Sequence, residues 1–261
     1  MSVRYIDAVW VRPPVALPLE GDDVHVWLAP LDLSPAALRL LEATLSRDER
    51  ERADRFYFER DRRRFVCARG VLRNLLADYQ DDDPAMLTFR YGSHGKPELD
   101  MGCGRPIAFN VSHSGELALL AFSRRGDVGV DVEQFRYMSD RDDIACRFFA
   151  RGEVARLRAL PLVEHEAAFF RCWTRKEAYV KAVGDGLARP LDAFEVTFAS
   201  DEPGRLTIRA DERESRRWAL RGLEVAPRYA AALVTEGRRH VSCWRWTDAR
   251  IPIVDYAREA V

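Results

Sequence analysis

Val128-Gly-Val-Asp131-Val-Glu133 is an apolar run that is broken by two acids. In a β-strand, residues i and i+2 point to the same face, so Asp131 and Glu133 project side by side while Val132 turns into the core. Two like charges on one face repel each other, and a divalent cation offsets that repulsion. Taken alone, this stretch is equally compatible with an ordinary strand whose polar face lies in water.

Further along the chain, Trp173-Thr-Arg-Lys176-Glu177-Ala-Tyr-Val-Lys181 has the pattern of a helix. Residues four apart share one helical face, which aligns Trp173, Glu177 and Lys181. A Glu177–Lys181 pair is also common on solvated helices, but this helix is apolar on several sides, which favours a polar pocket or an interface. Together the strand and the helix can gather three carboxylates and two lysines. That chemistry suits Mg²⁺ bridging a phosphate group.

The composition excludes several classes of protein. The chain has 261 residues, 47% of them hydrophobic, which allows one large domain or two of about half that size. A formal charge of -1 gives no reason to expect nucleic acid or membrane as a partner. The five cysteines form no CxxC pair, and no apolar run approaches the roughly 20 residues of a membrane span. We therefore expect a soluble cytoplasmic protein with reduced thiols.

The periodicity predicts an α+β fold. A capping box at Ser46-Arg-Asp-Glu49 opens one helix. We predict the other helices at 34–45, 61–79, 140–149, 152–160 and 165–183, and strands at 24–28, 107–111, 117–122, 128–133, 194–198, 206–210, 218–225, 229–234 and 241–246. The breaks between strands 107–111, 117–122 and 128–133 have hairpin length. This order indicates two similar α+β units that join near residues 126–129.

Other polar groups carry weaker signals. Ser112-His113 ends a strand, where both side chains could donate hydrogen bonds to phosphate, although a lone histidine is more often structural. No Gly-x-Ser-x-Gly elbow surrounds Ser112, which disfavours a serine-hydrolase triad. The arginines between Arg47 and Arg73 alternate with acids, so a salt-bridged surface is the default interpretation; a subset could bind phosphate or an acidic partner. No P-loop and no GxGxxG motif is present.

In order and spacing, the motifs resemble those of the Sfp-type 4′-phosphopantetheinyl transferases. The matching stretches are Gly95-Lys96-Pro97, Phe109-Asn-Val-Ser112-His113-Ser114, Gly129-Val-Asp131-Val-Glu133, Trp173-Thr-Arg-Lys176-Glu177-Ala-Tyr-Val-Lys181 and Gly184-Asp-Gly186-Leu187, with Arg52-Ala-Asp-Arg55-Phe56 and Arg64 upstream. The resemblance implies a monomer of two α+β halves with pseudo-twofold symmetry and an active site in the cleft between them. We expect residues 1–126 to bind the 3′-phosphate end of coenzyme A, and residues 127–261 to carry the metal and catalytic motifs.

The resemblance also implies a reaction and a role for each residue. A serine of an apo acyl or peptidyl carrier protein attacks the coenzyme A pyrophosphate, and 3′,5′-ADP leaves. The implied metal ligands for Mg²⁺ are Asp131, Glu133 and Glu177. The implied coenzyme A contacts are Arg52, Arg64, Lys96, Ser112, His113 and Lys181. Glu177 is the implied general base, Lys176 and Lys181 support it, and Glu153 matches an acidic position near the metal in some members.

Two other functions stay open at this point. One is a homologue that binds coenzyme A or carrier proteins without catalysis, and the other is a Mg²⁺-dependent nucleotide phosphohydrolase. We expect a carrier to dock through acidic residues near its serine, against the arginine-rich N-terminal region and the apolar helix around Phe169 to Trp173. The carrier protein and its pathway cannot be read from the sequence.

Overall fold

The first half of the chain forms a sheet and three helices. The computed structural model describes residues 10–14, 18–92, 95–100, 106–186, 189–200 and 202–251. The motif residue Leu187 and the tail from residue 252 lie outside these ranges. The elements of the first half are β1 (Asp23–Pro30), α1 (Pro35–Ala43), α2 (Arg47–Ala53), α3 (Glu59–Gln80), β2 (Phe89–Tyr91), β3 (Pro97–Leu99), β4 (Ala108–Ser114) and β5 (Leu117–Ser123).

The second half also combines a long helix with a sheet. Its elements are β6 (Val128–Gln134), α4 (Arg141–Phe148), α5 (Arg151–Ala159), α6 (Leu162–Val183), β7 (Glu195–Val196), β8 (Leu206–Thr207), α7 (Glu212–Arg217), β9 (Trp218–Leu223), β10 (Tyr229–Glu236) and β11 (His240–Arg245). Short 3₁₀ turns lie at Leu191–Ala193 and Asp248–Arg250. Among the described residues, no helix is both long and apolar enough to span a bilayer.

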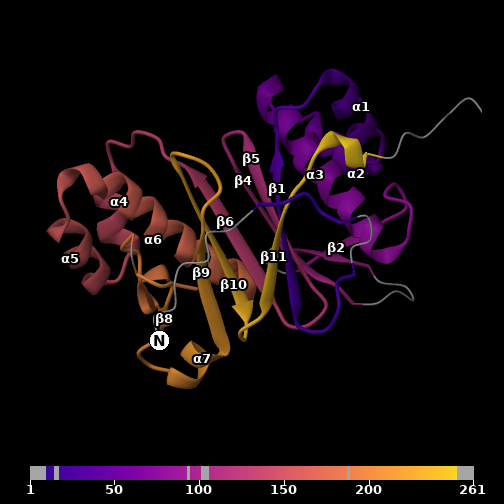
Figure 1. Ribbon diagram of the computed structural model, residues 1–261. Coiled ribbons are helices and arrows are strands. Elements are labelled where there is room, and N and C mark those ends of the chain that lie inside the picture. Colours follow the sequence, from indigo (N-terminus) through magenta and orange to yellow (C-terminus); the bar gives the residue numbers. More distant parts are fainter. Residues whose placement is uncertain are drawn as a thin grey trace, which may run out of the picture.

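The two sheets lie between two groups of helices (Figure 1). The strand orders are β11-β1-β5-β4 and β6-β10-β9. Alternate residues of a strand serve different cores: Trp27 packs in the core beneath α3, whereas its neighbour Val26 packs in the core that the two sheets share. Val130 and Val132 of β6 enter the same shared core. The sequence of layers is thus helix, sheet, sheet, helix, and the predicted α+β fold is confirmed.

Local signals in the sequence account for several elements. Helix α2 begins with the predicted capping box, in which the backbone N–H of Ser46 donates to Glu49 at 2.9 Å. The predicted hairpin between β4 and β5 is present and turns at Gly115, whose φ of 58° suits glycine. Helix α6 ends at Gly184 in the left-handed conformation, as the glycine stop predicts.

Two connections differ from the predictions. Strand β6 does not form a hairpin with β5, because β5 already has β1 and β4 on its two edges. The chain instead crosses to the second sheet, where β6 pairs with β10. Strand β11 returns to the first sheet and pairs in parallel with β1, as in the register Trp27 to Trp244. A domain boundary between residues 126 and 127 stays a prediction. Strand β11 belongs to the second half of the chain but pairs with β1 in the sheet of the first half. The short elements β2 and α7 were not predicted.

Candidate active site between the two sheets

Helix α6 crosses strand β6 very closely at Gly129. A Cβ atom built on Gly129 would lie 2.1 Å from the carbonyl oxygen of Ala178 on the helix. No side chain fits at that distance, so the crossing requires glycine. Glu177 directly precedes Ala178, and Lys181 lies one turn further on. The crossing therefore brings both side chains to the face of β6 that carries Asp131.

Asp131 is the centre of this site. Its side chain is only 4% exposed, and its Oδ1 accepts hydrogen bonds from Ser112 Oγ at 2.7 Å and from Lys181 Nζ at 2.6 Å. Lys181 Nζ also lies 3.0 Å from Ser112 Oγ, so strand β4, strand β6 and helix α6 meet here. The second oxygen, Oδ2, is buried and has no hydrogen-bond partner among the described residues. A buried carboxylate oxygen in that state indicates a place for a ligand.

Two further carboxylates add negative charge. Burial, followed by the charge of Asp131, raises the pKa of Glu133. The same two causes in the same order raise the pKa of Glu177, with Lys181 acting in the opposite direction. Burial is the larger cause of both shifts, and the second cause shows that Asp131 lies near enough to act on both carboxylates.

The residues fit a hard divalent cation by their chemistry. The site offers carboxylate oxygens, one of which is buried without a partner, and Mg²⁺ prefers oxygen ligands. As the side chains lie, no three acidic, histidine or cysteine groups in the described part of the chain are close enough to hold a metal ion together. A cation bound by Asp131, Glu133 and Glu177 together therefore requires at least one of these side chains to move.

Lys176 and Glu153 lie outside this site. Lys176 Nζ is fully buried and contacts Glu153 Oε2, Leu191 O and Phe194 O, each at 2.7 Å. Glu153 also caps the first turn of α5 and accepts from Val196 N at 2.7 Å. All three N–H donors of the lysine are thereby used. These contacts correct the expectations that Lys176 supports the reaction and that Glu153 lies near a metal.

His113 follows Ser112 on β4 and points to the opposite face of the strand, toward α3. Desolvation of its ring, followed by the positive charges of Lys181 and Arg64, lowers the pKa of His113. Both cations are therefore near enough to act on the ring. The imidazole is exposed, and Asp131 and Asp61 act on its pKa in the opposite direction with smaller effect.

Arg64 and Arg52 border this positive region. Arg64 pairs with Glu116, which lies in the turn after β4, and its Nε is buried without a partner among the described residues. Arg52 is exposed and its guanidinium lies 5.3 Å from the ring centre of Phe65, the neighbour of Arg64. The two predicted phosphate-binding arginines thus lie beside the same turn of α3.

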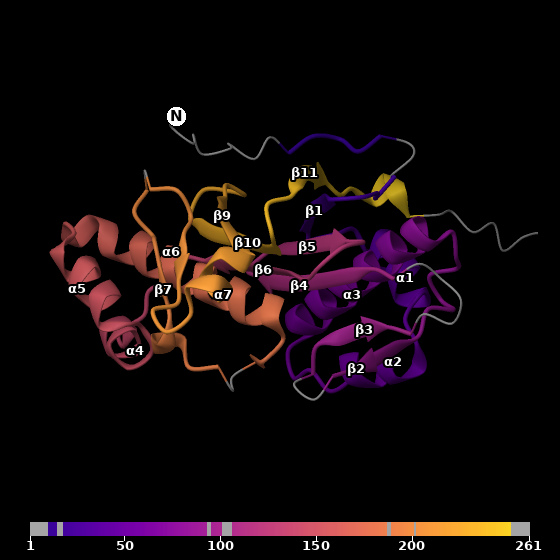
Figure 2. The same ribbon diagram turned by 90° about the horizontal axis from the view of Figure 1, so that it is seen from below.

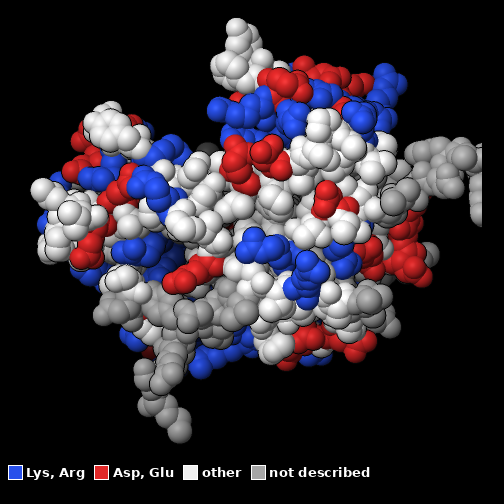
Figure 3. Space-filling model, turned by 45° about the horizontal axis from the view of Figure 1, so that its top comes forward, with Lys and Arg blue, Asp and Glu red and all other residues white. Residues whose placement is uncertain are grey.

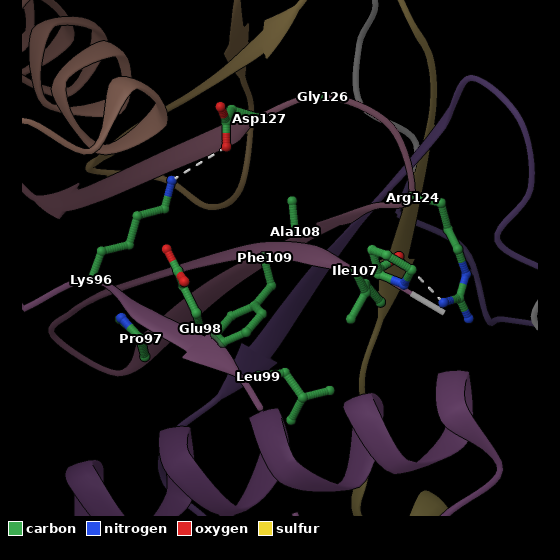
Figure 4. A pocket seen from close by; sticks show the side chains of 11 residues that line it. Lys96, Pro97, Glu98, Leu99, Ile107, Ala108, Phe109, Arg124, Gly126 and Asp127 are labelled. Atoms are coloured by element: carbon green, nitrogen blue, oxygen red, sulfur yellow. Dashed lines mark hydrogen bonds and ion pairs between the residues drawn. The ribbon is translucent and has the colours of Figure 1, made fainter. Parts of the chain in front are cut away.

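Lys96 lies at the other end of β4. Its Nζ donates to the carbonyl of Ala182 at 3.2 Å and lies 3.8 Å from Asp127, so it links the two halves. Figure 4 shows this side chain reaching toward Asp127, with Arg124 at the opposite end of a cavity. The cavity has a volume of about 370 Å³ and is lined by residues of β3, of β4 and of the turn before β6. Lys96 therefore does not join the carboxylates directly.

Three residues of the site were not predicted. Gly129 allows the helix crossing, and Asn110 and Ser114 bind β6 on either side of Ser112. A signal was present, because Asn110, Ser112 and Ser114 put a polar group at every second position of an apolar strand.

Two family descriptions match the chain. Residues 127–234 match the 4′-phosphopantetheinyl transferase superfamily, and residues 32–125 match the N-terminal region of 4′-phosphopantetheinyl transferases.

Individual relatives match over most of their length. The 4′-phosphopantetheinyl transferase HetI of Nostoc sp. is 44% identical over 198 residues, which is 76% of this chain and 83% of HetI. The 4′-phosphopantetheinyl transferase Sfp of Bacillus subtilis is 31% identical, over 72% of this chain and 81% of Sfp. A crystal structure of Thermotoga maritima holo-[acyl-carrier-protein] synthase aligns with 43% of this chain and 64% of its own, at 24% identity and a TM-score of 0.34.

Proposed function

This chain belongs to the 4′-phosphopantetheinyl transferase family, and we propose that it takes the phosphopantetheine group from coenzyme A with Mg²⁺ held by Asp131, Glu133 and Glu177. The family's reaction places that group on a carrier protein. One observation carries the proposed site: the buried Oδ2 of Asp131 has no partner in the described structure, and the nearby glutamates have raised pKa values.

The reaction requires charge neutralisation and alignment more than covalent help. The carrier's serine oxygen forms a bond to the phosphorus that bears the pantetheine arm, and the bond from that phosphorus to the bridging oxygen breaks. The leaving group is 3′,5′-ADP, and the serine proton passes to a base. When bound, Mg²⁺ supplies charge neutralisation at the pyrophosphate.

We assign the base to Glu177 and a phosphate contact to Lys181. A raised pKa makes the Glu177 carboxylate a stronger base, and the side chain is partly exposed, so a substrate can reach it. The Lys181 side chain is 29% exposed and is held by Asp131, so it can turn to an anionic substrate without leaving the site. His113, Arg64 and Arg52 are our candidates for the 3′-phosphate end, because Lys181 and Arg64 both act on the histidine ring. Lys96 lies at the opposite end of β4, so it is our candidate for a contact with another part of coenzyme A.

The mass of an apo carrier protein tests this function. The protein is incubated with coenzyme A, Mg²⁺ and an apo acyl or peptidyl carrier, beside an EDTA control. We expect a gain of one phosphopantetheine group that EDTA abolishes. A gain that persists in EDTA would refute the metal assignment. A second control without carrier follows 3′,5′-ADP, and its release there would indicate hydrolysis.

We further propose that the carrier docks on the exposed basic surface of α2 and the start of α3. Figure 3 shows arginine side chains, interspersed with acidic ones, over the end of the molecule that α1, α2 and α3 form. Tyr57 and Phe58 are exposed by 91% and 59% within this surface, and its exposed arginines are Arg47, Arg50, Arg52, Arg55 and Arg60. The expected apolar contact around Phe169 is corrected, because that ring is buried and packs on Phe149.

A further inference from the structure

Strand β4 meets strand β6 through side chains instead of a backbone ladder. β6 is an edge strand, so every second amide on its free edge lacks a strand partner. Figure 2 shows this junction between the two groups of helices. The contacts are Val130 N to Asn110 Oδ1 at 3.0 Å, Val132 N to Ser112 Oγ at 3.4 Å and Gln134 N to Ser114 Oγ at 3.1 Å.

The two serines of this row make the same pair of contacts. Ser112 accepts from the amide of one β6 residue and donates to the carboxylate of the residue before it, Asp131, at 2.7 Å. Ser114 repeats this arrangement two residues further on and donates to Glu133 Oε2, also at 2.7 Å. The repeat follows from the two-residue period of both strands. Each carboxylate is thus tied to the opposite half of the molecule through one of its oxygens.

Among the described residues, Ser114 makes the shortest hydrogen bond to Glu133. Arg136 also contacts Glu133 Oε2, at 3.2 Å, but its side chain is 59% exposed. Exposed arginines hold a carboxylate weakly. The serine has a short side chain on a strand whose backbone is fixed, and its hydroxyl has a second contact with Gln134 N. Within the described residues, the other oxygen of Glu133 has no hydrogen bond.

We propose that Ser114 is a positioning residue for Glu133, which it holds in place for the bound cation across the junction of the two halves. The inference rests on the proposed function, because it takes Glu133 as a metal ligand. Ser114 itself does not touch substrate or metal. Hydrogen bonds to a metal ligand typically change metal affinity by about 10- to 100-fold.

The turn that follows Ser114 keeps the row in register. A Cβ atom on Gly115 would lie 2.5 Å from Tyr229 Oη on β10 and 2.4 Å from Gln134 Oε1 on β6. The turn therefore touches the ends of two side chains, one from β10 and one from β6, and these contacts favour the observed register of β4 against β6. A slide of two residues is the smallest that keeps the same side chains facing β6, and it would bring Ser112 opposite Glu133.

Mn²⁺ affinity in the presence of coenzyme A and without a carrier tests this inference. Electron paramagnetic resonance reports free Mn²⁺ and needs no turnover. We expect Ser114→Ala to weaken Mn²⁺ binding about tenfold. Ser114→Thr keeps the hydroxyl, and we expect it to bind Mn²⁺ as the original protein does. Unchanged affinity in Ser114→Ala, or the same loss in a folded Ser114→Thr, would overturn the proposal.

Ser123→Ala is the matched control. Its hydroxyl also makes two hydrogen bonds, both within its own turn at Arg125, and lies at the end of the neighbouring strand β5. We expect similar urea midpoints for the two alanine variants but unchanged Mn²⁺ affinity for Ser123→Ala. Asp131→Asn separates the two proposals: if it too binds Mn²⁺ normally, the proposed metal site fails. If only Asp131→Asn loses affinity, the role of Ser114 alone is refuted.

Discussion

Helix α6 carries two lysine–carboxylate pairs that differ in almost every respect. The Lys176–Glu153 pair is fully buried, and each of its polar groups has a protein partner. The Lys181–Asp131 pair is partly open, and one oxygen of Asp131 has no partner in the described structure. Both ion pairs are short, at 2.7 and 2.6 Å. The distance between the charged atoms is therefore nearly the same in the structural pair and in the pair that we propose to be functional, and only the second has unused hydrogen-bonding capacity.

Breaking the buried pair should give the largest effect on stability. Lys176→Met leaves Glu153 charged and buried, and we expect it to lower the free energy of unfolding by about 4 kcal/mol. Urea denaturation measures this loss. Adding Glu153→Gln should recover a large part of it, because the buried charge is gone. In Lys181→Met, the loss should be smaller, because this lysine is partly exposed and Ser112 still donates to Asp131. Equal losses in the two lysine variants would remove the distinction.

Breaking the Lys181–Asp131 pair at Asp131 should mainly slow the transfer reaction. We expect Asp131→Asn to reduce transfer between about 10²- and 10³-fold, which is about 3 kcal/mol in the barrier. The urea midpoint should change little, because Ser112 can still donate to the asparagine oxygen. Steady-state transfer to a saturating carrier measures the effect. A protein that loses its stability in parallel with its activity would make Asp131 structural.

Glu177→Gln sharpens the contrast within the open site. A general base acts mainly in the transition state, so we expect transfer to fall about 10²-fold, or about 2.7 kcal/mol, with little change in coenzyme A affinity. Single-turnover rates and equilibrium binding of coenzyme A give the two quantities. Parallel losses would make Glu177 chiefly a ligand and leave the base unassigned.

Gly129→Ala tests whether the helix crossing supports the open pair. The added methyl group would meet the backbone of Ala178, and we expect a loss of about 2 kcal/mol in unfolding free energy together with slower transfer. Gly237→Ala is a control for the loss of a glycine, because nothing but the Arg239 side chain lies within 4 Å of its added Cβ, although its φ of 72° carries a backbone cost. Normal transfer by Gly129→Ala would show that the site tolerates a displaced helix.

The smallest effects should come from charges that belong to neither pair. Each exposed arginine of α2 and α3 should contribute less than about 1 kcal/mol to carrier binding. Raising the salt concentration should therefore weaken the carrier complex. This dependence of the affinity on salt should be smaller in Arg55→Ala and in Arg60→Ala. Fluorescence anisotropy of a labelled carrier measures the affinity. Salt-independent binding would refute the proposed docking surface.

Much of the fold could be predicted because its signals are local. The alternation at Val128–Glu133 and the four-residue spacing of Trp173, Glu177 and Lys181 depend only on the chain nearby. The polar residues Asn110, Ser112 and Ser114 recur at every second position, which the sequence shows. Their hydrogen-bond partners on β6 could not be predicted, because no local rule pairs a side chain with a distant amide. Lys176 was misplaced for a similar reason: adjacent helical residues point in different directions, and only the packing of α5 decides which direction is buried.

Strand β1 is an inner strand only because β11 lies along its outer edge. On the ribosome, β1 is synthesised early and β11 near the end of the described chain. Until β11 has been synthesised, the outer edge of β1 carries unpaired amide and carbonyl groups that a strand of another chain can bind. The first half of this enzyme therefore cannot complete its folding as it emerges. The first sheet is complete only once β11 has been synthesised, and a fragment cut at residue 126 would leave β1 with an unpaired edge.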